Sequence, residues 1–109
     1  MLIKGEKFNF NGEEMEVPPL PFGDMPFIMP RMVSFEKLDT KERLELIGDF
    51  VFACLKRNYP DLERARFDNE LLGSDNYEEA FIVALRVSRL TKKVEDDAGN
   101  RARLSSSTS

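Results

Sequence analysis

The segment Asn58-Tyr59-Pro60-Asp61 constrains the fold of this chain most strongly, because it separates two helical patterns. Proline has no backbone N–H and disfavours helical geometry in the residue before it, so one helix should end near Asn58. Pro60 suits the first position of a second helix, and Asp61 then lies where the helix dipole favours an anion. Tyr59 is expected to bury its ring at this corner and to keep its hydroxyl in water. We therefore predict that the segment is structural and fixes the angle between two helices.

Residues 2–17 predict a β-hairpin. Apolar residues alternate with polar ones on both sides of Asn11-Gly12, a dipeptide that tolerates the positive φ angles of a tight hairpin turn. The expected apolar face consists of Phe8, Phe10, Met15 and Val17. A two-stranded ribbon is only marginally stable alone, so this face should pack against the rest of the protein.

Residues 18–33 contain five of the six prolines and three of the five methionines. Proline at this density opposes both helices and central strands, so the segment is predicted to run extended over the surface. Methionine and phenylalanine side chains re-pack easily, which suits contact with a partner. The alternative is a connector that lies on the protein's own core. The candidate partner-binding residues here are Phe22, Met25, Phe27, Met29 and Met32.

Three helices are expected in the remainder, near residues 40–58, 60–72 and 76–91. Asp39 with Glu42, and Asp75 with Glu78, have the spacing of capping boxes at the starts of the first and third helices. The predicted buried stripe of the first helix is Leu44, Ile47, Phe50, Val51, Cys54 and Leu55, and Leu46 falls outside it. That of the third is Tyr77, Ala80, Phe81, Ala84, Leu85 and Val87. Apolar residues left over, and so candidates for weak self-association, are Phe52, Phe67, Leu71 and Ile82.

Together these patterns predict a mainly α protein with an N-terminal β-hairpin, that is, a small three-helix domain over residues 1–91. Residues 92–109 are polar and end in Ser-Ser-Ser-Thr-Ser, which cannot bury enough apolar surface to offset the entropy lost on ordering. This tail is therefore expected to be flexible. Ile82 lies among charged residues of the third helix and is a further candidate for partner contact.

The composition argues against catalysis. The chain has no histidine, which removes imidazole as a base or metal ligand. Cys54 is the only cysteine, so it cannot form an intramolecular disulfide or a Cys-rich zinc site, and one reduced thiol suits a cytoplasmic protein. A net charge of -4 gives no general attraction to nucleic acid or to an anionic membrane. We expect no enzymatic activity, no cofactor, no signal peptide and no nucleic-acid or membrane partner.

Four pieces of the chain, taken in order, resemble the tail assembly chaperone family of long-tailed bacteriophages and Mu-like prophages. They are the ribbon with its Asn11-Gly12 turn, the run Pro18-Pro19-Leu20-Pro21, the helix end Leu55 to Asp61, and a last helix closing near Val87-Ser88. The resemblance spans about residues 6–90. Its structural motif residues are Asn11, Gly12, Pro19, Leu20, Pro21, Asn58, Tyr59, Pro60 and Asp61.

The resemblance implies a non-enzymatic function. Such chaperones bind the long tape-measure protein and keep it soluble while tail-tube subunits assemble around it. The implied partners are the tape-measure protein and the tail-tube protein, with weak homo-oligomers along the client. The implied location is the bacterial host cytoplasm, with the chaperone absent from the mature virion. The alternative is a small structural or adaptor protein that stays in a virion or another assembly.

Overall fold

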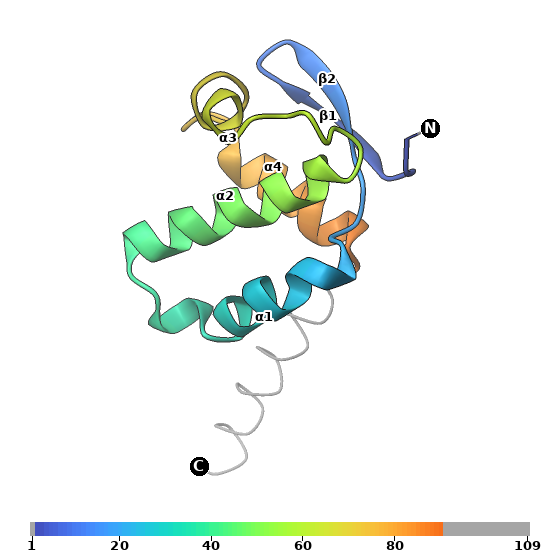
Figure 1. Cartoon of the computed structure of the whole chain (residues 1–109). Helices are drawn as coiled ribbons and strands as arrows, with labels where there is room; N and C mark the ends of the chain where they lie inside the picture. Colours follow the sequence, from blue (N-terminus) through green and yellow to red (C-terminus); the bar gives the residue numbers. More distant parts are fainter. Residues whose placement is uncertain (1, 91–109) are drawn as a thin grey trace, which may run out of the picture.

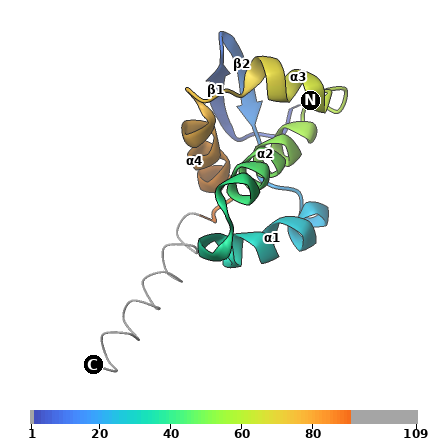
Figure 2. The ribbon, with the colours of Figure 1, turned by 90° about the vertical axis from the view of Figure 1, so that its left-hand side faces the viewer.

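The computed structural model describes residues 2–90, and the predicted tail, residues 92–109, lies outside this range. Two strands, β1 (Glu6–Phe10) and β2 (Glu13–Val17), precede four helices: α1 (Met25–Val33), α2 (Thr40–Lys56), α3 (Arg64–Arg66) and α4 (Tyr77–Val87). The expectation of a mainly α protein with an N-terminal hairpin is confirmed. The long helix α2 runs through the middle, with α1 on one side and α4 and the hairpin on the other (Figures 1 and 2). No helix within residues 2–90 is long and apolar enough to cross a membrane.

The hairpin forms as its sequence predicts. Strands β1 and β2 are antiparallel with Phe8 opposite Met15, and the turn residues Asn11 and Gly12 have φ angles of 54° and 95°. The apolar face carries buried side chains on both strands, namely Phe10, Met15 and Val17. Both strands contact α4, so this face closes one end of the core.

Helix α2 begins with the predicted capping box. The Asp39 carboxylate accepts from the Glu42 N–H at 2.8 Å, and the Glu42 carboxylate accepts from the Asp39 N–H at 3.0 Å. The predicted buried stripe is wrong at two positions, because Leu46 is completely buried and Leu44 is 47% exposed. Since α1, β2 and α4 all contact α2, the buried arc is wider than a single stripe and includes Leu46. Leu44 lies near the start of α2 and is not buried by these elements.

The prediction that residues 18–33 run extended is wrong from residue 22 onward. A short 3₁₀ turn, η1 (Phe22–Asp24), leads into α1. Pro26 lies in the first turn of α1, where its missing N–H has no partner within the helix. Pro30 lies inside the helix and removes one backbone bond. Burial of Ile28 and Met32, which are 3% and 7% exposed, offsets that loss, so Met32 belongs to the core.

The second predicted helix begins later than expected and is not a regular α-helix. Residues 58–62 form a turn, in which the Leu62 N–H donates to the Tyr59 carbonyl and the Lys56 ammonium donates to the carbonyls of Pro60 and Leu62. Helix α3 therefore starts at Arg64 instead of Pro60, and one π-helical turn, η3 (Phe67–Leu71), follows it. In this winding Phe67 and Leu71 point into the core, so neither is left over for self-association.

Helix α4 begins without the predicted capping box of Asp75 and Glu78. Asn76 takes the N-cap position, and its side chain accepts from the Gly73 N–H and donates to the Leu71 carbonyl. These bonds hold the loop between η3 and α4. The buried residues of the helix are Ala80, Val83 and Ala84, of which the predicted stripe lacks Val83. The helix ends at Val87, and Leu90 is buried beyond it.

Candidate interaction surfaces

The segment Arg57-Asn58-Tyr59 binds the N-terminal part of the chain at three places. The Asn58 side chain accepts from the Ile3 N–H at 2.6 Å and donates to the Ile3 carbonyl at 2.9 Å. The Tyr59 hydroxyl accepts from the Glu16 N–H at 2.9 Å, and Arg57 donates to the Pro19 carbonyl at 3.0 Å. The half-buried Tyr59 hydroxyl therefore has a protein partner in the hairpin, which the sequence does not predict.

The other motif residues lie around this attachment. Leu20 is buried, and its N–H donates to the Ser88 hydroxyl at 2.9 Å, which ties the Pro-Pro-Leu-Pro run to the end of α4. The Asn11 side chain donates to the Leu71 carbonyl and so joins the hairpin turn to η3. Pro60 and Asp61 are exposed in the turn. Through these contacts the motif residues connect the hairpin to the helices, so their position in the fold is structural.

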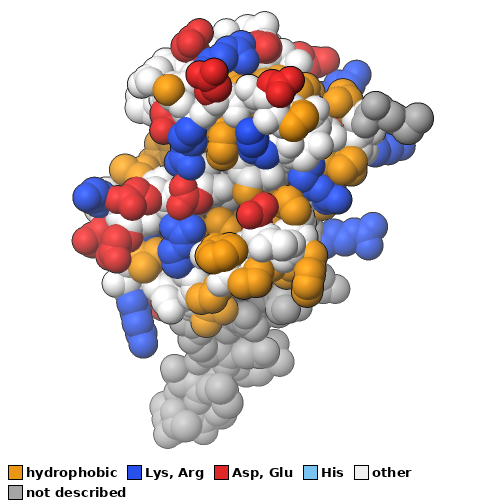
Figure 3. Space-filling model, in the orientation of Figure 1, with side chains coloured by type: hydrophobic (Ala, Val, Ile, Leu, Met, Phe, Trp, Pro, Cys, Tyr) orange, Lys and Arg blue, Asp and Glu red, His pale blue; other side chains and the backbone are white. Residues whose placement is uncertain are grey.

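Helix α1 carries an apolar outer face, which we call the α1 surface. It comprises Pro26, Phe27, Pro30 and Val33 of α1 together with Phe22 of the preceding turn η1, all exposed. Phe22, Phe27 and Val33 are 84%, 71% and 60% exposed, which is unusual for large apolar side chains. Figure 3 shows hydrophobic side chains gathered over α1 in the lower part of that view. Of the candidates in this segment, Phe22 and Phe27 lie on the surface, Met25 and Met29 are partly buried beneath it, and Met32 is in the core.

The composition of α1 explains this surface. Eight of the nine residues of α1 are apolar, and the exception is Arg31, which is paired with Asp49 of α2 at 2.9 Å. Ile28 and Met32 are buried inside, while Phe27, Pro30 and Val33 recur at every third position on the outside. A helix that is apolar on both sides normally has protein on both sides. The outer side of α1 is thus a candidate for covering by a partner.

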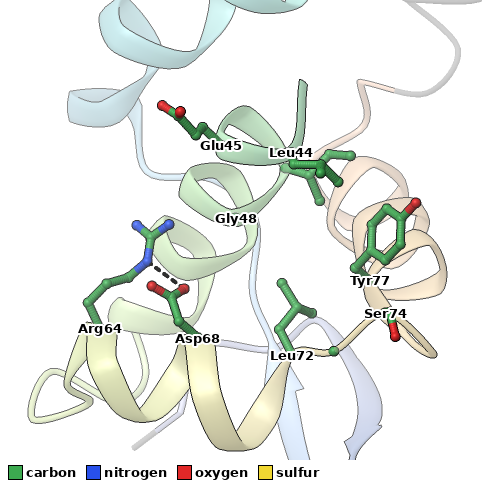
Figure 4. A pocket seen from close by; sticks show the side chains of 10 residues that line it. Leu44, Glu45, Gly48, Arg64, Asp68, Leu72, Ser74 and Tyr77 are labelled. Carbon is green, nitrogen blue, oxygen red and sulfur yellow. Dashed lines mark hydrogen bonds and ion pairs between the residues drawn. The ribbon is translucent and has the colours of Figure 1, made fainter. Parts of the chain in front are cut away.

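A second apolar surface lies between α2, η3 and the start of α4, and we call it the α2–α4 groove. Two adjoining hollows of about 570 Å³ and 400 Å³ form it, and both are lined by Leu44, Ile47 and Tyr77. Leu72 lines the first hollow, and Phe81 and Ile82 line the second. In Figure 4, Leu44, Leu72 and Tyr77 lie around one side of the first hollow, and the Arg64–Asp68 pair lies across from them.

Arg64 lies on the polar side of this groove. Its guanidinium is 2.9 Å from both the Asp49 and the Asp68 carboxylates, and its Cζ lies 5.2 Å from the centre of the Phe52 ring. A side chain at Gly48 would force the Arg64 guanidinium to shift, because a Cβ there would lie 2.9 Å from Nη2 of Arg64. Partial burial lowers the pKa of Arg64, but the hydrogen bonds to Asp68 and Asp49 outweigh that effect and raise it. The guanidinium therefore stays charged and its position is fixed.

Cys54 has no reactive character. Its side chain is completely buried, and this burial raises the pKa of the thiol to about 12, against a smaller opposing effect of the hydrogen bond with Ser88. A thiol of this kind is protonated at neutral pH and is a poor nucleophile or metal ligand. Within residues 2–90 there is no group of three or more His, Cys, Asp or Glu side chains placed to hold a metal ion.

The sequence patterns find the α1 surface in part and miss the groove. Ile82 is exposed, as expected, but it lies in the groove on α4 and not with Phe22 and Phe27. Leu44 is assigned to the core by its helical spacing, so its place in the groove is not foreseen. No protein-family model matches this chain, and no curated protein and no solved structure matches it either.

Proposed function

We propose that this protein is a non-enzymatic phage tail assembly chaperone that binds the tape-measure protein and keeps it soluble while tail-tube subunits assemble. The observation that carries the proposal is the α1 surface, where Phe27 and Val33 of the apolar helix α1 and Phe22 of the preceding turn are exposed. The motif resemblance supplies the client. The protein would act in the bacterial host cytoplasm and would be absent from the mature virion.

The size of the α1 surface suits weak, reversible binding to a client. Burying one Phe or Val side chain contributes roughly 1.5–3 kcal/mol, and association itself costs several kcal/mol in lost freedom. A surface with three large apolar side chains therefore supports weak binding per copy. Weak binding by many copies keeps a long client covered and still lets the assembling tube displace each copy.

The residues beneath the surface support binding to varied apolar sequences. Met25 and Met29 are partly buried and pack against the core beside the exposed Phe27. Methionine has an unbranched, flexible side chain that adapts to differently shaped partners. A client with many similar but non-identical apolar stretches calls for such adaptability.

The test is co-expression with the tape-measure protein of the same locus. We expect that protein to be insoluble alone and soluble when this chain is present, with both recovered in one complex. A tape-measure protein equally insoluble with and without this chain contradicts the proposal.

The alternative function is that of a small structural protein that remains in the assembly, for which the same apolar surface would serve as a permanent contact. Mass spectrometry of purified tails separates the two functions. The chaperone should be missing from finished tails and present in assembly intermediates, whereas a structural subunit should be present in finished tails at a fixed ratio.

Weak self-association accompanies the proposal, since copies bound along a rod would touch one another. The sequence offers four apolar side chains as candidates for self-association. Of these, Ile82 is 51% exposed and Phe52 is partly buried. We expect a mass that rises with concentration in sedimentation experiments. A strict monomer at millimolar concentration removes this part of the proposal.

A further inference from the structure

We infer that the α2–α4 groove binds an amphipathic α-helix of the client, one that carries lysine or arginine beside its apolar stripe. This inference rests on the proposed function and adds a second, more specific site to it. The α1 surface is the exposed outer side of one helix and the turn before it, whereas the groove is a hollow with walls from α2, the α3–η3 segment and α4.

The shape and lining of the groove suit a helix. Its two hollows share Leu44, Ile47 and Tyr77, so they form one continuous depression along α2 and α4. Leu44 and Ile82, about half exposed, flank the second hollow from α2 and α4 respectively. Helices that dock in apolar grooves insert side chains spaced at i, i+3 or i+4, and i+7. Two adjoining hollows offer places for successive anchors of that kind.

The charges around the groove select a basic helix. Glu45 on the α2 wall and Glu78 on the α4 wall are both exposed. Glu45 has only a distant pairing with Lys41, at 3.8 Å, and Glu78 accepts from the neighbouring Tyr77 hydroxyl at 3.2 Å. Both carboxylates can therefore accept further bonds from a ligand.

The two arginines of the groove are already engaged. Arg64 is bonded to Asp49 and Asp68, and Arg43 donates to the carbonyls of Phe35 and Glu36. The charge of Arg64 is thus balanced by two carboxylates, and the Arg43 guanidinium is held by two backbone carbonyls of the protein itself. A helix with basic residues on both sides of its apolar stripe would place them next to Glu45 and Glu78, while an acidic helix would meet like charges.

The probe is a labelled helical peptide of about 20 residues with a leucine stripe flanked by lysines, together with a twin in which glutamates replace the lysines. Fluorescence anisotropy measures the binding of each to the full chain. We expect the lysine peptide to bind more tightly than the glutamate peptide, and the difference to shrink as salt is raised. Equal binding of the two peptides overturns the assignment of a basic ligand.

Point variants place the peptide in the groove. Leu44→Gln should weaken the lysine peptide roughly tenfold or more, because one apolar anchor contact is lost. Leu2→Gln is the matched control: Leu2 is 52% exposed, against 47% for Leu44, and belongs to neither surface. Ile82→Gln, on the opposite wall, is the second variant and should weaken binding in the same way. Unchanged affinity in both groove variants, with unaltered melting curves, overturns the inference.

The tape-measure solubility assay separates this inference from the function on which it rests. If the wild-type chain solubilises the client and Leu44→Gln does so equally well, the proposed function stands and the groove inference fails. If the wild-type chain fails to solubilise the client, the function fails, whatever the peptide result. If Leu44→Gln abolishes self-association in sedimentation but leaves peptide binding intact, the occupant is a second copy and the inference is overturned.

Discussion

The hydroxyl of Tyr59, just beyond α2, accepts a hydrogen bond from the backbone N–H of Glu16 in β2 at 2.9 Å. Glu16 stands opposite Lys7 in the hairpin, and its N–H turns away from β1 toward the tyrosine. This bond satisfies a backbone donor on the outer side of the ribbon, which within residues 2–90 consists of two strands. A tyrosine in a helix-terminating segment thereby holds the hairpin in place.

Tyr59→Phe should lower the free energy of unfolding by about 1 kcal/mol, because it leaves the Glu16 N–H without its acceptor and keeps the ring. Tyr77→Phe is the matched control. Its hydroxyl donates to the neighbouring, exposed Glu78 carboxylate and to no other group within residues 2–90, so we expect a change within about 0.5 kcal/mol. Urea unfolding of both variants measures the difference. Equal stabilities would show that the Tyr59 bond contributes nothing.

The two predicted capping boxes give a second matched pair. Asp39→Ala should cost about 1 kcal/mol, since the Asp39 carboxylate caps the Glu42 N–H at the start of α2. Asp75→Ala should stay within about 0.5 kcal/mol of the wild-type protein, since Asn76 holds the N-cap position of α4. Thermal or urea unfolding provides the comparison. A larger loss of unfolding free energy in Asp75→Ala than in Asp39→Ala would contradict the capping assigned to the starts of α2 and α4.

Cys54 should make the protein less stable at alkaline pH. Its pKa is raised from 9.0 to about 12 in the folded state, so the folded protein holds the thiol proton where the unfolded chain releases it. The contribution of the Cys54 thiol to the free energy of unfolding is fully present below pH 9. It is lost as the pH rises from 9 to 12, at up to about 1.4 kcal/mol per pH unit. Urea unfolding between pH 8 and about 10.5 measures the slope, and Cys54→Ala should have a shallower one. Identical slopes would exclude this contribution.

The parts of the fold that the sequence predicts are those specified by neighbouring residues. The Asn11-Gly12 turn needs two adjacent residues with positive φ, and both have it. The capping box needs only Asp39 and Glu42, three residues apart, and both of its bonds form. In each case a local hydrogen bond or backbone preference decides the outcome, so no tertiary contact is required to foresee it.

The errors arise where tertiary packing outweighs local preference. Pro30 disfavours a helix, yet α1 forms because Ile28 and Met32 bury their side chains in the core. Leu46 lies off the predicted stripe of α2 but is buried, since α2 is covered by several elements. The α2–α4 groove joins Leu44 to Leu72 and Tyr77, which are distant in sequence, so no periodicity in one helix reveals it.

The most direct measurement of the central claim is tape-measure solubility with a variant that removes the apolar character of the α1 surface. Phe22→Gln combined with Phe27→Gln changes two side chains that are 84% and 71% exposed, so the protein should melt as the wild-type chain does. Leu2→Gln serves as the control for loss of one exposed apolar side chain elsewhere. We predict that the double variant leaves the tape-measure protein in the insoluble fraction while the control keeps it soluble. A folded double variant that solubilises the tape-measure protein as well as the wild type does would contradict the role of the α1 surface.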